Sequence, residues 1–380
     1  MTQPIPIIGA GLAGLTFARC LLHSGIRTTL YEKASTAPRH NYAITLHAYS
    51  YQPLLRYLGI DERVFQSTVA VDADVGGTVR INHVGGGDDK SFRTNRAKLE
   101  GWLKEGLDVR YSSALKDIET PTTTPTRGPK LHFTNGDTLT PDFIVAADGA
   151  HSIIRKSILP STKIQVLPLV AINGKRRVDP QTYDSLFAPA MKNINFLQTT
   201  HGTTVLNISL NERTPKHTSI SWTFSRPPHS NNDALYRPDR SNADARDIPE
   251  AFFDEIAALK GLQQPFAEVF DAENMKQDRV LHWLMRKCLT PLSELQDLYG
   301  KQRVVLLGDA AHAQPIVGGN GANAAMLDGV EFAKVIAERG VGEIAMAYET
   351  RYSEWERADG ECEVRIQEMH ESGLRNAASL

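Results

Sequence analysis

Cysteine is scarce in this chain, and its few copies lie far apart. The 380 residues contain three cysteines, Cys20, Cys288 and Cys362, and no two of them form a Cys-x-x-Cys pair. This spacing excludes a disulfide framework and a cysteine-based metal site. We therefore expect buried free thiols in a reducing compartment, and no metal.

Long hydrophobic runs and an excess of charge of one sign are also absent. No apolar stretch reaches the about 20 residues that cross a bilayer, and the formal net charge is −2. A nearly neutral chain gives no reason to expect nucleic acid or an anionic membrane as a partner. The first apolar run begins at Ile5, which leaves no room for a signal peptide. We expect a cytoplasmic protein of two or three domains, without a membrane span.

The N-terminal stretch carries the strongest pattern in the sequence. An apolar run at 5–8 leads into the glycine turn 9–14, which reads GAGLAG. An amphipathic segment at 15–23 follows, and a second β-like run at 28–31 ends at Glu32. Strand, glycine turn, helix, strand and acid in this order predict a βαβ unit that binds a dinucleotide.

Each part of this unit has a physical role. Gly9 permits the tight turn, Gly11 lets a pyrophosphate approach the backbone, and Gly14 allows close packing of helix on strand. The free N–H groups at the helix start, near Leu12 and Ala13, favour the phosphates. Glu32 can accept hydrogen bonds from a ribose 2′-OH and would repel a phosphate there, which favours FAD or NAD over NADP as the bound dinucleotide.

Two later stretches repeat the theme of an acid at a glycine turn after a buried strand. The apolar run 142–147 ends in Asp148-Gly149, and the run 304–307 ends in Gly308-Asp309. Pro315, Gly318 and the helix start Gly321-Ala322-Asn323 follow the second acid. Arg96 begins another predicted helix, where the macrodipole opposes a cation, and this placement suits an arginine that reaches an external anion.

The middle of the chain predicts β-structure. Residues 69–75 and 78–84 are β-rich, and the glycine-rich segment 85–89 suggests a turn after them. In the run 219–225, Ile220, Trp222 and Phe224 share one face, so that face should pack on another layer. Near the C-terminus, 343–370 is charged and amphipathic and predicts a closing pair of helices.

The three motifs together resemble a known family. GAGLAG with Glu32, AADGAHSIIR and LLGDAAHAQPIVGGNGAN resemble the FAD-dependent aromatic hydroxylases, the single-component flavoprotein monooxygenases with the p-hydroxybenzoate hydroxylase fold. This resemblance implies a mixed α/β fold with a Rossmann-like FAD-binding domain, an inserted β-sheet substrate domain and a C-terminal helical segment. The corresponding ranges are 1–68, 96–160 and 286–340 for the first, 69–95 and 161–285 for the second, and 341–380 for the third.

The resemblance also implies a set of residues that contact FAD. Glycine-loop residues would line the pyrophosphate, acids would hold the ribose and ribityl chain, and the last glycines would lie under the isoalloxazine ring. The implied set is Gly9, Gly11, Leu12, Ala13, Gly14, Glu32, Lys33, Arg96, Asp148, Gly149, Asp309, Pro315, Gly318, Gly321, Ala322 and Asn323. This sequence departs from the family in the strand after the first acid, which reads Asn41-Tyr42-Ala43-Ile44 without glycine.

The activity implied is oxygen insertion. NAD(P)H would reduce FAD, and O₂ would pass through a flavin C4a-hydroperoxide into an aromatic or polycyclic small molecule. His47, Trp222 and His282 are candidate substrate-side residues, since a histidine can deprotonate a phenol. Core packing is the competing interpretation for Trp222, and a structural imidazole the one for His282. We expect a monomer or homodimer in secondary metabolism or aromatic catabolism.

Three alternatives stay open at this point. A Baeyer–Villiger or epoxidising monooxygenase would use the same fold and cofactors. A FAD-dependent dehydrogenase or oxidase would insert no oxygen into its product. A non-catalytic FAD-binding protein would need no Asp-Gly and Gly-Asp turns facing the flavin, and both turns are intact.

Overall fold

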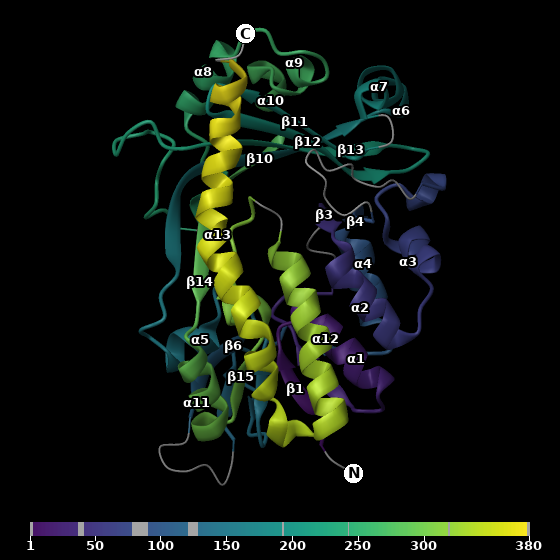
Figure 1. Cartoon of the computed structure of the whole chain (residues 1–380), viewed down its shortest axis with the longest axis vertical. Coiled ribbons are helices and arrows are strands. Elements are labelled where there is room, and N and C mark those ends of the chain that lie inside the picture. The colour runs from purple at the N-terminus through teal and green to yellow at the C-terminus, as the bar shows by residue number, and fades with distance from the viewer. Residues whose placement is uncertain are drawn as a thin grey trace.

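Two sheets and one long helix organise the chain (Figure 1). The computed structural model describes residues 3–36, 42–77, 90–120, 128–191, 194–241, 243–317 and 320–377. Over these ranges, none of the helices combines the length and the apolar character that a membrane crossing requires.

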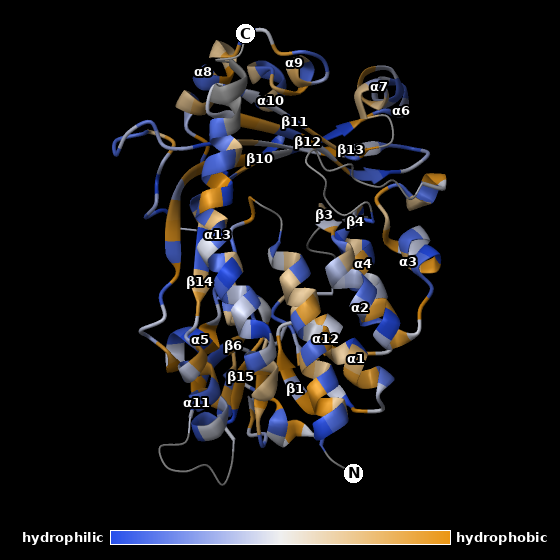
Figure 2. Ribbon diagram, in the orientation of Figure 1, coloured by the Kyte–Doolittle hydropathy of each residue, from blue (hydrophilic) through white to orange (hydrophobic). Residues whose placement is uncertain are grey.

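Five parallel strands form the first sheet, in the order β15-β9-β1-β2-β5. Every residue of β1, β9 and β15 is buried, as expected for short apolar strands with both faces covered. Figure 2 shows β1 and β15 in hydrophobic colours behind the helices. Their bounds are β1 Ile5–Ile8, β2 Thr28–Tyr31, β5 Asp108–Arg110, β9 Ile144–Ala146 and β15 Val304–Leu306.

Helices and a small sheet cover the parallel strands. The βαβ unit predicted at the N-terminus is present, and its helix α1 packs along α12. The small sheet is antiparallel, in the order β6-β7-β8, and its Phe133 stacks on Tyr31 with ring centroids 5.0 Å apart. The bounds are α1 Leu12–His23, α2 Ala48–Leu58, α4 Arg96–Lys104, α5 Ile153–Ile158, α11 Leu292–Gln302, α12 Gly321–Arg339, β6 Leu115–Glu119, β7 Lys130–Phe133 and β8 Thr138–Leu139.

The second large sheet is antiparallel, in the order β11-β12-β13-β10-β14-β16. One of its faces is apolar, since Ile220, Trp222 and Phe224 all join a core with Phe252 of α8, as the alternation predicts. The bounds are β10 Gln165–Val178, α6 Pro180–Thr182, η2 Tyr183–Phe187, α7 Ala188–Met191, β11 Phe196–His201, β12 Thr204–Arg213, β13 Thr218–Arg226, η3 Ala243–Arg246, α8 Glu250–Ala258, α9 Phe266–Val269, α10 Ala272–Met275, β14 Arg279–Leu289, η4 Gly308–Ala310 and β16 His312–Ala313.

The prediction of a strand at 69–75 is wrong. Helix α3 (Glu62–Val69) ends there and a short 3₁₀ turn, η1 (Ala73–Val75), follows. Val69 at the end of the helix and Val71 in the following turn are both buried. Their β-branched side chains therefore serve core packing and do not mark a strand. The predicted strand at 78–84 and the turn at 85–89 lie outside the described residues. Strand β4 (Phe92–Asn95) then pairs with β3 (Ala43–Leu46).

The division of the chain into domains stays a proposal. One contact supports the assignment of residues 69–95 to the domain of the antiparallel sheet. The backbone N–H of Arg213 on β12 donates to the carbonyl of Val71 at 2.7 Å. Val71 also joins the apolar core of the antiparallel sheet. Residues next to 69 therefore associate with the sheet to which the proposal assigns them.

The C-terminal region is one helix, α13 (Met346–Ala377), preceded by the short turn η5 (Val341–Glu343). The predicted pair of helices is wrong, because the segment has no proline and its glycine at 360 alone does not break a helix that packs along its length. Tyr348 donates to the Leu306 carbonyl at 2.9 Å, and His370 lies 3.1 Å from the Ser225 hydroxyl. One helix therefore contacts both large sheets (Figure 1).

Candidate functional site

The glycine turn after β1 forms a cradle that is open at one position. Gly9 has φ +104°, and a Cβ on it would lie 2.3 Å from the Ala147 carbonyl oxygen. A Cβ on Gly14 would lie 2.3 Å from the Gly9 oxygen, whereas one on Gly11 would meet nothing within 4 Å. Helix α1 begins with no side-chain cap and no acid in its first turn. The open side of Gly11 beside these N–H groups fits a pyrophosphate.

Glu32 lies at the end of β2, buried beside the glycine turn. Its Oε2 accepts from the Ala10 N–H at 3.0 Å and its Oε1 from the Ala34 N–H at 2.8 Å. These bonds fix the carboxylate and leave lone pairs that can accept ribose hydroxyls. The next residue, Lys33, is exposed at the same edge.

Two aspartates follow neighbouring strands of the parallel sheet, Asp148 after β9 and Asp309 after β15. Asp148 Oδ2 accepts from the Ile153 N–H at 2.8 Å, but Asp148 Oδ1 and Asp309 Oδ1 are both buried without a hydrogen-bond partner. Burial raises the pKa of both carboxyl groups. A buried, unpaired carboxylate oxygen is costly, so these two atoms indicate a ligand whose hydroxyl groups donate to them.

Arg155 joins these two acidic turns, although sequence reasoning assigned it no role. It is buried and donates to the Ala310 carbonyl at 2.7 Å, to the Asp309 carbonyl at 3.2 Å, and to the Ala150 carbonyl. The arginine at the end of AADGAHSIIR was the available signal. Arg155 therefore fixes the position of the Asp-Gly turn, which includes Gly149, against the Gly-Asp turn.

The N-terminus of α12 lies close to Asp309. It has no side-chain cap and no acid in its first turn, and a Cβ on Gly321 would lie 3.8 Å from Asp309 Oδ1. The N–H groups of Gly321 and Ala322 are therefore available at the positive end of the helix. Pro315 is buried just before this helix, and the predicted Gly318 lies outside the described residues.

Asn323 connects this helix start to the β3–α2 corner. Its Oδ1 accepts from the His47 N–H at 2.9 Å and from the Ser50 hydroxyl at 2.6 Å, and its Nδ2 donates to the Thr45 carbonyl at 2.9 Å. The side chain thus positions His47 beside the start of α12. The His47 ring lies 2.9 Å, at Nδ1, from the Ser91 hydroxyl and stacks on the exposed Tyr49.

Arg96 is engaged within the protein. Its Nε lies 2.8 Å from Glu100 Oε1, and its guanidinium contacts the Tyr42 hydroxyl. Burial opposes its charge, but Tyr42 and Glu100 outweigh burial and raise the pKa of Arg96. The charge of Arg96 also lowers the pKa of Asp309, a smaller effect than burial, so both groups belong to one electrostatic environment.

The other two substrate-side candidates lie on the apolar face of the antiparallel sheet. Trp222 packs against Phe252 and Phe270, and its Nε1 donates to Asp278 at 2.6 Å. His282 is buried, and its carbonyl accepts from Arg240. Burial, reinforced by Arg240 and Arg237, lowers the pKa of His282 to about 4. This placement favours structural roles for both side chains.

Basic side chains gather beside the Asp-Gly turn. His151 and Lys33 are exposed, and Arg286 on β14 is half-buried. Burial lowers the pKa of His151, and the charges of Arg286, Lys33 and Arg155 lower it further. A positive potential therefore borders the turn, where it can attract an anionic ligand.

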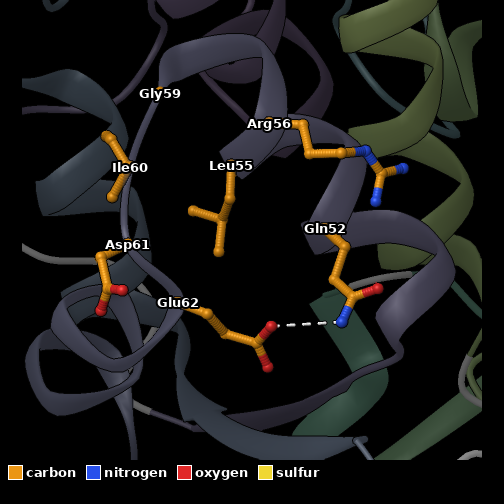
Figure 3. A pocket seen from close by; sticks show the side chains of 7 residues that line it. All are labelled: Gln52, Leu55, Arg56, Gly59, Ile60, Asp61 and Glu62. Atoms are coloured by element: carbon orange, nitrogen blue, oxygen red, sulfur yellow. Dashed lines mark hydrogen bonds between the residues drawn. The ribbon is translucent and has the colours of Figure 1, made fainter.

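Two cavities in the described part of the chain differ in their relation to this site. The larger, a hollow of about 470 Å³ between α2 and α3, is drawn in Figure 3 and shares no residue with the site. Its Gln52 and Glu62 bond each other at 3.2 Å. The smaller, of about 40 Å³, lies between α13 and the segment before α12, with Pro315 and Ile366 in its wall. Within the described ranges, no cluster of His, Cys, Asp and Glu could hold a metal.

Comparison with known proteins extends these observations. A family model described as FAD binding domain matches residues 1–359. FAD-dependent monooxygenase adaC of Aspergillus niger is 34% identical over 358 residues, covering 88% of this chain and 85% of that protein. FAD-dependent monooxygenase nscC of Neosartorya fischeri is 32% identical over 384 residues, covering 94% and 93%.

Solved structures support the fold. HpxO of Klebsiella pneumoniae complexed with FAD matches with a TM-score of 0.69 at 19% identity, covering 99% of this chain and 92% of that chain. The 2,6-dihydroxypyridine-3-hydroxylase of Arthrobacter nicotinovorans matches with a TM-score of 0.68 at 14% identity, covering 97% and 92%.

Proposed function

The chain belongs to the family of FAD-dependent monooxygenases with the p-hydroxybenzoate hydroxylase fold, and from this we propose that it inserts one oxygen atom from O₂ into an aromatic or polycyclic small molecule, with NAD(P)H as electron donor. The observation that carries the cofactor site is the pair of buried, unpartnered oxygens Asp148 Oδ1 and Asp309 Oδ1. They lie in turns beside the open cradle at Gly11 and the uncapped start of α12.

The residues of this chain would hold FAD along its whole length. The glycine turn would take the pyrophosphate and Glu32 the adenosine ribose, while Asp309 would accept from the ribityl hydroxyls. The N–H groups of Gly321 and Ala322 would stabilise negative charge on the ring. When bound, FAD supplies electron transfer from the nicotinamide and activation of O₂.

The cations beside the Asp-Gly turn support a nicotinamide dinucleotide as donor. Lys33 and Arg286 would attract its phosphates, and the exposed His151 ring, whose pKa is lowered, would add a hydrogen-bond donor rather than a charge. Glu32 affects only the dinucleotide that binds at the glycine turn. The preference of the enzyme for NADPH or NADH as electron donor would therefore depend on these cations.

His47 is the substrate-side group that the geometry favours. Asn323 fixes its backbone next to the start of α12, and its Nδ1 lies within hydrogen-bond distance of the Ser91 hydroxyl. A histidine held in this way can take a proton from a phenol and make the ring more nucleophilic. We propose this base role within a tailoring enzyme of secondary metabolism that acts as a monomer or homodimer.

The test is NADPH and NADH oxidation by FAD-loaded protein under ¹⁸O₂, across phenols, indoles and polycyclic ketones. Product that carries ¹⁸O, formed with substrate-stimulated nicotinamide oxidation, supports the proposal. Ring-expanded lactone or epoxide would instead identify a Baeyer–Villiger or epoxidising enzyme. Oxidised product without ¹⁸O would contradict oxygen insertion. With peroxide it would indicate an oxidase, and without peroxide a dehydrogenase.

A further inference from the structure

His312 is a buried histidine that comes directly after the Gly-Asp turn. It follows Asp309 by three residues and lies on β16, which pairs with β14. The residue is 2% exposed, and its Nε2 lies 2.5 Å from Asp328 Oδ2. A buried imidazole that bonds a carboxylate is held in one orientation, so it also fixes the backbone that carries it.

Asp328 belongs to α12, seven residues after the first helical residue, Gly321. This separation is two helical turns, or about 10 Å along the helix axis. The bond between His312 and Asp328 therefore ties the Gly-Asp turn to the helix whose uncapped start belongs to the candidate site. The turn and the helix also approach each other at that start, because a Cβ on Gly321 would lie 3.8 Å from Asp309 Oδ1.

Helix α13 supports this bond from the other side. Asp328 Oδ1 accepts from Arg351 Nε and from Trp355 Nε1, both at 2.9 Å, and all three residues are buried. The Trp355 ring also stacks on the His312 ring, with an interplanar angle of 22°. One carboxylate oxygen is thus engaged by the strand after the Gly-Asp turn and the other by α13.

The charges of these groups act on Asp309. Burial raises the pKa of Asp309, His312 and Arg96 lower it, and Asp328 raises it. Within the described ranges, Asp309 Oδ1 is buried without a hydrogen-bond partner. Its position relative to the start of α12 therefore decides whether a ribityl hydroxyl can donate to it while the attached ring meets the helix N–H groups.

We propose that His312 and Asp328 are positioning residues for FAD, because their bond holds Asp309 at the distance from the start of α12 that this cofactor requires. Arg351 and Trp355 support the pair, so docking of α13 favours FAD binding. The inference rests on the cofactor site of the proposed function and not on oxygen insertion. Binding groups must be held within about 0.5 Å of their productive geometry by the residues behind them, and this pair provides that support.

The test compares FAD with ADP as ligands of the FAD-free protein by calorimetric titration. ADP would fill only the part of the site formed by the glycine turn and Glu32, so its binding does not depend on Asp309. We expect His312→Leu to weaken FAD binding about tenfold and to leave ADP binding within about twofold of the wild type. The variant should fold, because Asp328 keeps both of its bonds to α13.

Two further variants complete the series. His312→Gln keeps an N–H donor that can reach Asp328 and should bind FAD within about threefold of the wild type. His370→Leu removes a buried histidine from the far end of α13, where it lies 3.1 Å from the Ser225 hydroxyl, and should leave both affinities unchanged. Unchanged FAD affinity of His312→Leu, or an equal loss of FAD and ADP binding, would overturn the inference.

Hydrogen exchange of the wild type provides a second measurement that needs no variant. If docking of α13 favours FAD binding, bound FAD must in turn stabilise the docked helix. We expect FAD to slow amide exchange at residues 351–355 relative to the edge strand β11, and saturating ADP to produce no such difference. The same exchange pattern with FAD and with ADP would overturn the inference.

The outcome is separable from that of the proposed function. Weakened FAD binding in His312→Leu, together with wild-type product that lacks ¹⁸O, would support the positioning role and count against oxygen insertion. Wild-type product that carries ¹⁸O, together with unchanged FAD affinity of His312→Leu, would support oxygen insertion and overturn the positioning role.

Discussion

His312 Nε2 lies 2.5 Å from Asp328 Oδ2, in the interior between α12 and α13. The other carboxylate oxygen of Asp328 accepts from Arg351 Nε and from Trp355 Nε1, both at 2.9 Å. The His312 ring also stacks on Trp355, with centroids 4.1 Å apart. Because His312 follows the Gly-Asp turn by three residues, this pair connects the turn that carries Asp309 to the C-terminal helix.

Asp328→Asn should destabilise the fold by about 3 kcal/mol, because it removes the buried counter-charge of Arg351 and leaves only the exposed Glu354 to pair with it. Burial opposes ionisation of Asp328, but His312 and Arg351 outweigh burial and lower its pKa. The stability contributed by this charge is therefore present above the ordinary carboxyl pKa of about 4 and is lost as pH falls through the lower folded-state value. Urea unfolding at pH 7 measures the loss. The control Asp297→Asn, in an exposed pair with Lys301, should change stability by less than about 1 kcal/mol.

Two substitutions in the glycine turn should separate an effect on FAD binding from an effect on stability. Gly11→Ala should leave the Tm of the FAD-free protein unchanged, since its Cβ meets nothing, but should weaken FAD binding at least tenfold because the methyl group obstructs the pyrophosphate. Gly14→Ala should lower the Tm itself, because its Cβ overlaps the Gly9 oxygen. Calorimetry and FAD titration measure the two effects. A Gly11→Ala protein that binds FAD normally would exclude the cradle as the phosphate site.

Asp309→Asn should stabilise the FAD-free protein at neutral pH. Burial raises the pKa of Asp309, so the folded state binds the proton more tightly than the unfolded state. Stability therefore falls as pH rises from the ordinary pKa through the raised one, and the amide removes this loss. FAD affinity should fall at least tenfold, because a charge-assisted acceptor is lost. Unfolding curves between pH 4 and pH 8, with and without FAD, measure the gain in stability and the loss of FAD affinity. A FAD-free variant that is less stable than the wild type would contradict the raised pKa of Asp309.

Arg286→Gln should raise the KM for the nicotinamide donor about tenfold with a smaller change in kcat, because the lost charge attracts phosphate. The effect should shrink as salt concentration rises. Steady-state kinetics at two ionic strengths measure it. Arg279→Gln, an exposed position on the same strand, is the control and should behave as the wild type.

His47→Ala should lower kcat for a phenolic substrate and remove the acid limb of the pH–rate profile, since a neutral imidazole is needed to take the phenol proton. FAD binding and substrate-free nicotinamide oxidation should stay within twofold of the wild type. An unchanged profile would exclude His47 as the base.

The sequence predicts well those parts of the fold that depend on residues close together in the chain. The turn at Gly9, the acid at 32 and the helix start at 321 follow from local backbone needs, and all three are present. The division of α13 into two helices was wrong because the packing partners of that segment, Leu306 and Ser225, are remote in sequence.

The substrate side shows the same limit. Alternation correctly places Trp222 and Phe224 on one face, but it does not tell which face meets the cofactor layer. That choice depends on where α13 and the β3–β4 hairpin lie, which no local pattern encodes.

The unbroken helix α13 also constrains the order in which the protein assembles during synthesis. Strand β15 completes the parallel sheet only after residue 306 has been made, and α13, which contacts both sheets, follows last. Strands β10 to β14 are complete earlier and come from one continuous stretch. We therefore expect the nascent chain to present a formed antiparallel sheet beside an unfinished cofactor layer, so that the ability to retain FAD arises only near the end of translation.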